Sequence, residues 1–280
     1  MWWILLVLLY GLLKGGREIV KKKSLEKNTV IEVLIIYTAL SFLFVLPSAP
    51  KAWGVDPVTM LFIAFKSLII FAAWILSFKA IKQMPVSLYG IIDLSRVLFA
   101  TLLGVAILKE KMSILQIAGL VLVCVGLVMC ERRKNLKEEK VSARVVIYTL
   151  LSCLFNAISG VMDKILTKNV TSTQLQFWYM LFLVIYYIIF IVVTKEKVKI
   201  VSALKNYWIW ILAIMFVIGD KALFIANRMP DSRVTVMTLI KQSCCIVTIL
   251  AGKFIFKEKN IGYKLICACI IIAGIVVAVL

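Results

Sequence analysis

The chain has 280 residues, of which 63% are hydrophobic, and its formal net charge is +19. Soluble domains hold roughly 45–50% apolar residues, so this composition excludes an ordinary soluble protein and predicts a protein of the lipid bilayer. The 33 Lys and Arg residues lie in short clusters between apolar runs, a spacing that is typical of membrane loops and argues against a nucleic-acid groove.

Ten segments are predicted to be membrane-spanning helices, because a run of about 20 apolar residues crosses a hydrocarbon layer roughly 30 Å thick. In chain order they are 2–21, 30–48, 57–79, 85–108, 113–130, 145–167, 173–194, 207–227, 232–256 and 260–280. The first segment opens with MWW and has neither a basic stretch nor a small-residue cleavage site, so we interpret it as a span and not as a signal peptide.

One strongly polar connection, ERRKNLKEEKVSAR at 131–144, separates two sets of five segments. We therefore predict a five-helix repeat at 1–130, a linker at 131–144 and a second five-helix repeat at 145–280. Similarity between the sets supports this division, since LFATLLGVAILKEK at 98–111 matches IVTILAGKFIFKEK at 246–259. At the same offset of 148 residues, Gly126 matches Gly274.

An odd number of spans in each set forces the second set to enter the membrane from the opposite side. The predicted fold class is an all-α integral membrane protein with ten transmembrane helices, arranged as two inverted five-helix repeats. Inverted repeats around a site near the bilayer midplane recur in secondary transporters, where rocking of one half against the other exposes the site to each side in turn.

The stretch at 66–129 resembles the EamA-type repeat of the drug/metabolite transporter superfamily. It has an aromatic-x-x-Ala-hydrophobic phrase, then a small-residue and proline turn (QMPVS), then a helix that finishes as LLGVAILKEK. The second copy, at 221–259, has Cys244-Cys245 where a Ser-Pro-like pair is common in the family, and Lys253 inside its terminal run. The resemblance covers essentially the whole chain and implies a transporter with both termini in the cytoplasm.

The charged triplet that ends each matching run contains a glutamate, Glu110 in the first and Glu258 in the second. Each glutamate follows one long helix and precedes another, so its carboxylate is predicted to accept hydrogen bonds from the free N–H groups of the next helix. The flanking lysines are expected to reach toward headgroups or carbonyls. The alternative is an ion pair that gates transport.

Charged residues deep inside the spans are the stronger site candidates, because a charge at the centre of a membrane helix is costly and is kept away from lipid. Asp93 and Lys241 occupy equivalent positions of the two repeats, 148 residues apart. We predict that they pair across the repeat interface. Such a pair would either face the substrate and gate transport or simply fix the register of the helices.

Further candidates for substrate contact are polar residues placed where two inverted halves would enclose a cavity. They are Lys14, Lys66, Asn156 and Asp220, with Trp74 and Tyr179 as apolar walls. Consecutive residues on a helix point about 100° apart, so Asp220 and Lys221 are not expected to face the same seam. Lys14 precedes Gly15-Gly16, and the alternative for it is a lysine that reaches the interface beside a close helix contact.

The sequence lacks the elements of the common catalytic and ATP-driven sites: it contains no histidine, no Gly-rich phosphate loop and no Cys/His metal pattern. We predict no enzyme activity, no metal and no cofactor, and we interpret the seven cysteines as small core residues. The first span also has no central glutamate of the kind carried by the related small multidrug-resistance transporters. The excess of cations at depth favours an anionic or zwitterionic solute.

The predicted function is a secondary transporter in the cell membrane, a multi-pass protein that moves a small metabolite, such as an amino acid or organic anion, by alternating access, as an exporter. Its partners are that solute and the lipid bilayer, with proton coupling or substrate exchange through Asp93 and Asp220, which we expect to be the only well-buried carboxylates. A flippase for lipid-linked sugars is the alternative within the superfamily; a membrane scaffold or an integral enzyme would not require duplicated halves.

The orientation predicted by charge is opposite to that implied by the family. The connections after odd-numbered spans hold 19 Lys and Arg residues, whereas those after even-numbered spans hold 8. Because short basic loops resist translocation, this bias predicts a cytoplasmic linker and external termini.

Overall fold

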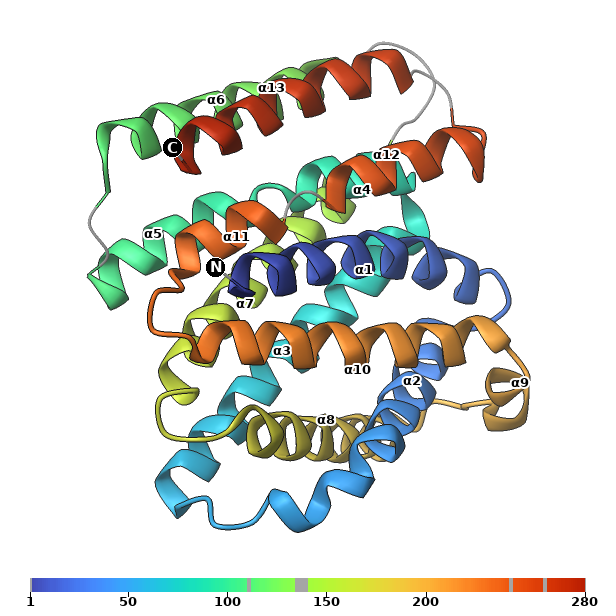
Figure 1. Ribbon diagram of the computed structural model, residues 1–280. Helices are drawn as coiled ribbons and strands as arrows, with labels where there is room; N and C mark the ends of the chain where they lie inside the picture. The colour runs from blue at the N-terminus through green and yellow to red at the C-terminus, as the bar shows by residue number, and fades with distance from the viewer. Residues whose placement is uncertain (1, 110–111, 134–140, 242–243, 259–260, 280) are drawn as a thin grey trace.

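Each of the ten apolar segments forms helix in the computed structural model, which describes residues 2–109, 112–133, 141–241, 244–258 and 261–279 (Figure 1). The first half holds α1 (Trp2–Ser24), α2 (Val30–Val45), η1 (Leu46–Lys51), α3 (Pro57–Gln83), α4 (Val86–Asp93), α5 (Arg96–Leu108) and α6 (Ile114–Arg133). The second half holds α7 (Ala143–Leu166), α8 (Ser172–Thr194), α9 (Ile200–Leu204), α10 (Tyr207–Arg228), α11 (Val234–Lys241), α12 (Cys244–Phe254) and α13 (Ile261–Val279). Those ranges contain no β-strand.

One of the predicted spans is divided into two helices, which the sequence did not predict. The segment at 85–108 becomes α4 and α5, while the segment at 232–256 holds α11 and α12 on either side of residues 242–243, which lie outside the described residues. At the division between α4 and α5 the chain tightens into i→i+3 hydrogen bonds, such as those from Leu94 N to Ile91 O and from Ser95 N to Ile92 O. Discontinuous helices are a recurring feature of transporter binding sites.

Repeated capping residues begin the second helix of each half. Thr29 accepts a hydrogen bond from the Glu32 N–H while the Glu32 carboxylate accepts from the Thr29 N–H. Thr171 and Gln174 form the same capping box at the start of α8. Such a box satisfies two of the free N–H groups of a helix terminus, so both halves fix this helix boundary in the same way.

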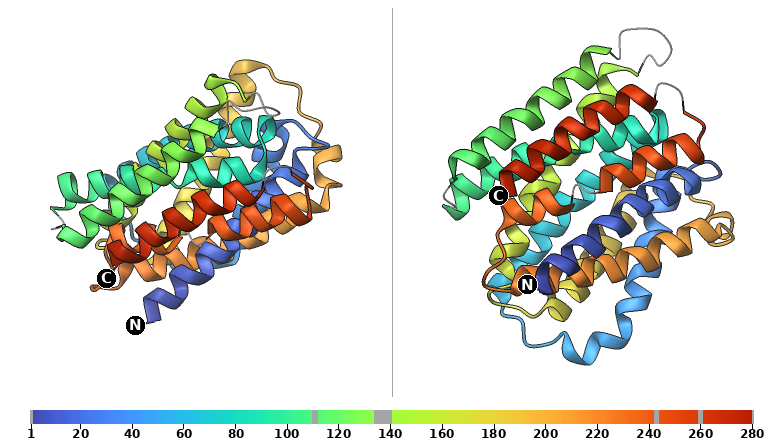
Figure 2. Two further views of the ribbon diagram at one scale, coloured as in Figure 1. Left: turned by 90° about the horizontal axis from the view of Figure 1, so that it is seen from above. Right: turned by 45° about the horizontal axis from the view of Figure 1, so that its top comes forward.

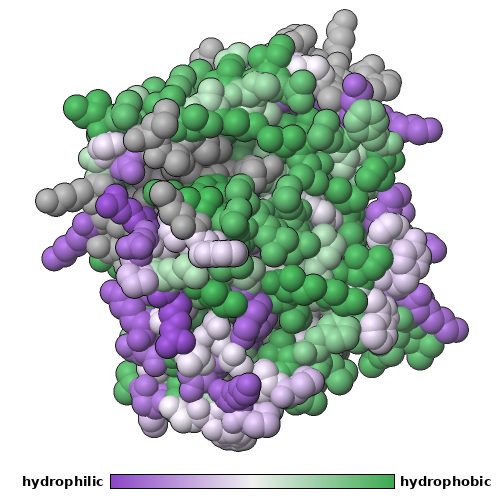
Figure 3. Space-filling view, viewed as in Figure 1, coloured by the Kyte–Doolittle hydropathy of each residue, from purple (hydrophilic) through white to green (hydrophobic). Residues whose placement is uncertain are grey.

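Within the described residues, six helical segments are long and apolar enough to cross a membrane: Val30–Lys51, Pro57–Gln83, Val86–Ile107, Ala143–Leu166, Ser172–Thr194 and Tyr207–Arg228. Shorter apolar stretches lie at Ile114–Gly126, Cys244–Phe254 and Gly262–Gly274. In the view of Figure 3, hydrophobic residues dominate the centre and top of the surface, and hydrophilic residues gather toward its left and right edges. The chain is therefore a multi-pass membrane protein, and the count of ten spans remains a prediction.

The contacts between helices come in matching pairs: when each helix is replaced by its counterpart in the other half, one contact becomes another that is also present. The contact of α1 with α10 corresponds to that of α7 with α3, and the contact of α5 with α7 corresponds to that of α12 with α1. In the same way, α4–α12 corresponds to α11–α5, and α3–α8 corresponds to α10–α2. Figures 1 and 2 place both termini at one end of the bundle, while the C-terminal end of α6 lies at the other.

The matched glycines of the two halves lie where α6 and α13 run side by side at one edge of the bundle (Figure 2). A Cβ atom on Gly126 would lie 2.4 Å from Ile271 Cγ1, and one on Gly274 would lie 2.7 Å from the carbonyl oxygen of Gly119. Small residues let two membrane helices approach closely, so these glycines set the distance between α6 and α13.

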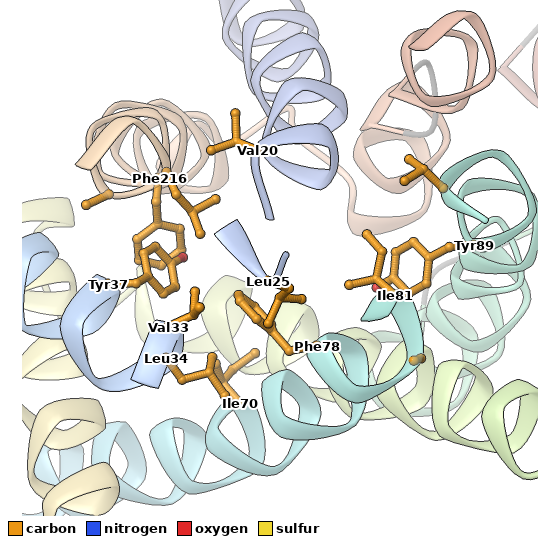
Figure 4. Packing of buried hydrophobic residues seen from close by; sticks show 14 of the residues in the cluster. Val20, Leu25, Val33, Leu34, Tyr37, Ile70, Phe78, Ile81, Tyr89 and Phe216 are labelled. Carbon is orange, nitrogen blue, oxygen red and sulfur yellow. The ribbon is translucent and has the colours of Figure 1, made fainter. Parts of the chain in front are cut away.

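Buried apolar side chains of α1, α2, α3, α4 and α10 pack together in the core (Figure 4). The centre of the Tyr37 ring lies 5.1 Å from that of Phe216 and 5.2 Å from that of Trp74. Aromatic pairs at these separations add to the burial energy of the side chains. The core thus holds α2, α3 and α10 together beside the polar cavity described next.

Candidate functional site

A polar cavity of about 110 Å³ lies between α1, α3, α7 and α10, with α2, α4, α5, α8 and α11 closing its sides. Seven of the eight candidate residues predicted from the sequence line it: Lys14, Lys66, Trp74, Asn156, Tyr179, Asp220 and Lys241. The structure therefore brings together side chains that are up to 227 positions apart in the chain, from Lys14 to Lys241.

The eighth candidate, Asp93, lies behind the cavity wall and is held by two cations that line the cavity. Its carboxylate is 2.5 Å from Lys14 Nζ and 2.7 Å from Arg96 Nη2. The Cys153 thiol also lies 3.5 Å from Asp93 Oδ1. Asp93 ends α4, so these contacts hold the division between α4 and α5 against α1 and α7.

The predicted pairing of Asp93 with Lys241 needs correction. The oxygens of Asp93 are engaged by Lys14 and Arg96, whereas the Lys241 ammonium lies 5.7 Å from the centre of the Tyr10 ring. Lys241 ends α11, and equivalent positions in two repeats need not touch when nearer partners are available. Lys14, which was predicted as a substrate contact, takes the role expected of Lys241.

Three further charged residues of α1 line the cavity, and the sequence did not single them out as site candidates. Arg17, Glu18 and Lys21 are all buried and line the cavity together with Lys14. Lys21 lies 2.6 Å from Glu18 and 3.2 Å from the Ser77 hydroxyl. Residues 14, 17, 18 and 21 recur at intervals of three and four, which is the signal of one helix face and could have identified them.

Another buried ion pair joins α3 to α7. Lys66 Nζ is 2.9 Å from Asp163 Oδ1, and it also lies 3.6 Å from the centre of the Tyr179 ring. Asp163 and Glu18 are both buried carboxylates, so the expectation that Asp93 and Asp220 are the only ones was wrong. Asp163 lies close to the end of its helix, where the sequence alone does not distinguish a buried carboxylate from one at the interface.

Asp220 and its neighbour Lys221 point to different places, as the helix geometry predicts. Asp220 lines the cavity and lies 3.3 Å from Arg17 Nη1. Lys221 points away toward α8, where its ammonium donates a hydrogen bond of 2.6 Å to the Thr173 hydroxyl. One turn of α10 therefore serves both the cavity and the outer surface.

The cavity lining combines charge of both signs with aromatic rings. Six of its side chains are cationic and three are carboxylates: Lys14, Arg17, Lys21, Lys66, Arg96 and Lys241 against Glu18, Asp163 and Asp220. Eight more are aromatic: Tyr10, Tyr37, Trp74, Phe78, Tyr89, Tyr179, Phe216 and Phe224. Lys241 is the lining lysine that forms no ion pair within the described residues.

Lysines near helix ends join the helices of each half in the same way. Lys22 of α1 donates to the carbonyls of Ile81, Lys82 and Met84 at the end of α3. Lys164 of α7 donates to the carbonyls of Asn227 and Met229 at the end of α10. Cations stabilise the free carbonyls of a helix C-terminus, so each half secures its first helix to its third through equivalent carbonyls.

Glu258 caps a helix of the opposite half, and not the helix that follows it in the chain. Its carboxylate accepts hydrogen bonds from the Val86 N–H at 2.8 Å, from the Ser87 N–H and from the Ser87 hydroxyl, which lie at the start of α4. Lys264 lies 3.5 Å from the same carboxylate. Glu110, the equivalent residue of the first half, lies outside the described residues.

Comparison with known proteins identifies the family. The model of the EamA-like transporter family matches residues 1–131 and again residues 143–280. No curated protein matches the sequence. A solved structure described only as a crystal structure of a protein has a TM-score of 0.69 over 97% of this chain and 98% of its own, at 12% identity, which shows a shared fold. The two matches cover nearly the whole chain, and the protein belongs to the EamA-like transporter family.

Proposed function

We propose that the protein is a secondary transporter that moves a small anionic or zwitterionic metabolite out of the cell, across the cell membrane, by alternating access. Membership of a family of membrane transporters supplies the class of activity. The observation that carries the proposal is the buried cavity with charged and aromatic lining between the two halves. Ionisable side chains inside a membrane protein are costly to bury and mark the pathways of solutes or ions.

The proposed mechanism uses the two halves as inverted five-helix repeats, at 1–130 and 145–280, which rock about the cavity. The exchange symmetry of the helix contacts supports this arrangement. The interfaces that must open lie between α1 and α10 and between α3 and α7, and each is crossed by one buried ion pair, Arg17–Asp220 and Lys66–Asp163. A solute that competes for one of these pairs would loosen the interface that it crosses.

The proposed solute has a carboxylate or similar anionic group and a flat apolar part. Lys241 carries a positive charge without a carboxylate partner among the described residues, so it is the side chain best suited to the anionic group. Trp74 and Tyr179, whose ring centres lie 6.4 Å apart, are the aromatic side chains that contact the apolar part. Asn156, whose amide donates to Ser152 O, leaves its own carbonyl oxygen for a donor on the solute.

Uptake into proteoliposomes tests the proposal directly. Purified protein should accumulate one class among labelled amino acids, nucleobases and organic anions, and it should not scramble fluorescent lipids. Lys241→Gln should raise the apparent KM for that class by about tenfold, the loss of one charge-assisted contact, while Lys253→Gln at an exposed position of α12 should leave it unchanged. Lipid scrambling without solute uptake would show that the protein is a flippase and not a solute transporter. Chemical conversion of a solute would show that it is an enzyme.

A further inference from the structure

A second hollow lies on the outer surface of the bundle, separate from the central cavity. This groove has a volume of about 670 Å³ and lies between α1, the α2–η1 segment, α8 and α10. Its walls include Leu9, Phe44, Ile218 and Ile225, which are all exposed. Apolar side chains exposed on a membrane protein face lipid, so acyl chains can enter the groove from the side.

Two lysines give the groove a positive charge. Lys51 of η1 and Lys221 of α10 both line it, and neither forms an ion pair with a carboxylate among the described residues. Two like charges that share an apolar groove repel each other unless an anion lies between them. The groove therefore has the two features that an anionic lipid requires of a binding site: apolar walls for its acyl chains and cations for its headgroup.

The charged end of the groove lies beside the first turn of α8, at one end of a helix long enough to cross a membrane. Lys221 is seven residues before the end of α10, yet its ammonium hydrogen-bonds Thr173, the second residue of α8. Its long side chain thus carries the charge to the first turn of α8, as lysines do near a membrane interface.

Two tryptophans lie near the same end of α8. The exposed Trp53 ring lies 5.7 Å from that of Trp178, whose indole N–H donates to the carbonyl of Ala52, one residue beyond Lys51. Trp side chains are enriched at membrane–water interfaces, where the ring lies among the headgroups.

We propose that this groove binds an anionic glycerophospholipid, with its phosphate between Lys51 and Lys221 and its acyl chains along the walls formed by α1, α2 and α10. Because Asp220 and Lys221 are neighbours on α10, the lipid holds the outer side of the helix turn whose inner side forms the Arg17–Asp220 pair. The bound lipid is a fixed component of this face and not the transported solute.

Native mass spectrometry of the full chain tests the site with dioleoylphosphatidylglycerol as the probe. The wild-type protein should retain this lipid in preference to dioleoylphosphatidylcholine, because only the former is a net anion. The double variant Lys51→Gln/Lys221→Gln should bind phosphatidylglycerol about tenfold or more weakly. Lys168→Gln, an exposed lysine outside the groove, is the matched control and should bind as the wild type does.

Three results would overturn the proposal. One is equal retention of phosphatidylcholine, which would remove the role of charge, and another is unchanged binding in the double variant. The third is displacement of the lipid by millimolar inorganic phosphate or glycerol 3-phosphate, which would make the groove a site for free anions. If the glutamine variant does not fold, Lys51→Arg/Lys221→Arg, which retains both charges, should still bind the lipid, and loss of binding there would also contradict the assignment.

Discussion

Asp93 is fixed by two cations from different helices, Lys14 of α1 and Arg96 of α5, and its side chain is 4% exposed. Removing one partner of a buried ion pair leaves an uncompensated charge, which costs more than removing both. The cluster therefore joins the division between α4 and α5 to α1, and its members should act as a unit.

A double-mutant cycle tests this unit. Asp93→Asn and Lys14→Met should each lower the free energy of unfolding of the purified protein by about 3–5 kcal/mol, the cost of a broken buried ion pair. The double variant should lose less than the sum of the two single losses. Asp93→Asn combined with Lys241→Met is the matched cycle. Its losses should add to within roughly 0.5 kcal/mol, and strong coupling there would restore the Asp93–Lys241 pair.

At the scale of elements, the contact between α6 and α13 depends on glycines at corresponding positions of the two halves. A Cβ atom on Gly274 would meet backbone atoms of α6, at 2.7 Å from Gly119 O and 3.0 Å from Val123 N. Backbone atoms cannot turn aside as a side chain can, so any larger residue must push the two helices apart.

Gly274→Ala should therefore destabilise the protein by about 1–3 kcal/mol, measured as a lower melting temperature in detergent. Gly262→Ala on the same helix is the control, because a Cβ atom there would meet nothing within 4 Å. Alanine favours helix over glycine by up to about 1 kcal/mol, so the control should be neutral or more stable. Equal destabilisation by both changes would show that the close contact of α6 and α13 does not matter.

The sequence predicts the elements better than their divisions and partners. Runs of apolar residues locate all ten helical segments, because hydrocarbon thickness sets their length. The i→i+3 turn at Leu94 and Ser95 leaves no such signature, since both halves of that span are equally apolar. Arg17 and Lys21 were not singled out as site residues because they belong to a basic stretch, 17–23, close to the end of α1.

The partners of the buried charges depend on tertiary geometry. A lysine side chain is long and flexible, so Lys14 and Lys241 are equally plausible partners of Asp93 until the positions of α1 and α11 are known. The residues that line the cavity were more predictable, because polar side chains inside membrane-spanning helices are kept away from lipid and face the interior of the bundle. Asp163 and Glu18 were missed where a polar residue lies near a helix end or inside a basic run.

At the scale of the whole molecule, the charge distribution predicts the orientation in the membrane. The excess of basic residues on the linker side survives when the buried Arg17 and Lys21 are removed from the count of 19, against 8 on the other side. We expect alkaline phosphatase fused at Leu280 to be active and the same fusion at Asn135 to be inactive. The reverse pattern would show that both termini are cytoplasmic, as the family resemblance implies.

Alternating access is the central claim, and accessibility of the cavity from each side of the membrane tests it most directly. Asn156→Cys places a thiol in the cavity on α7, and Ile147→Cys places one on the exposed apolar face of the same helix, with the parent protein as background for its native cysteines. A membrane-impermeant maleimide should modify Asn156→Cys when added to either face of sealed vesicles, and it should leave Ile147→Cys unmodified. Modification of Asn156→Cys from one face alone, or from neither, would contradict the account.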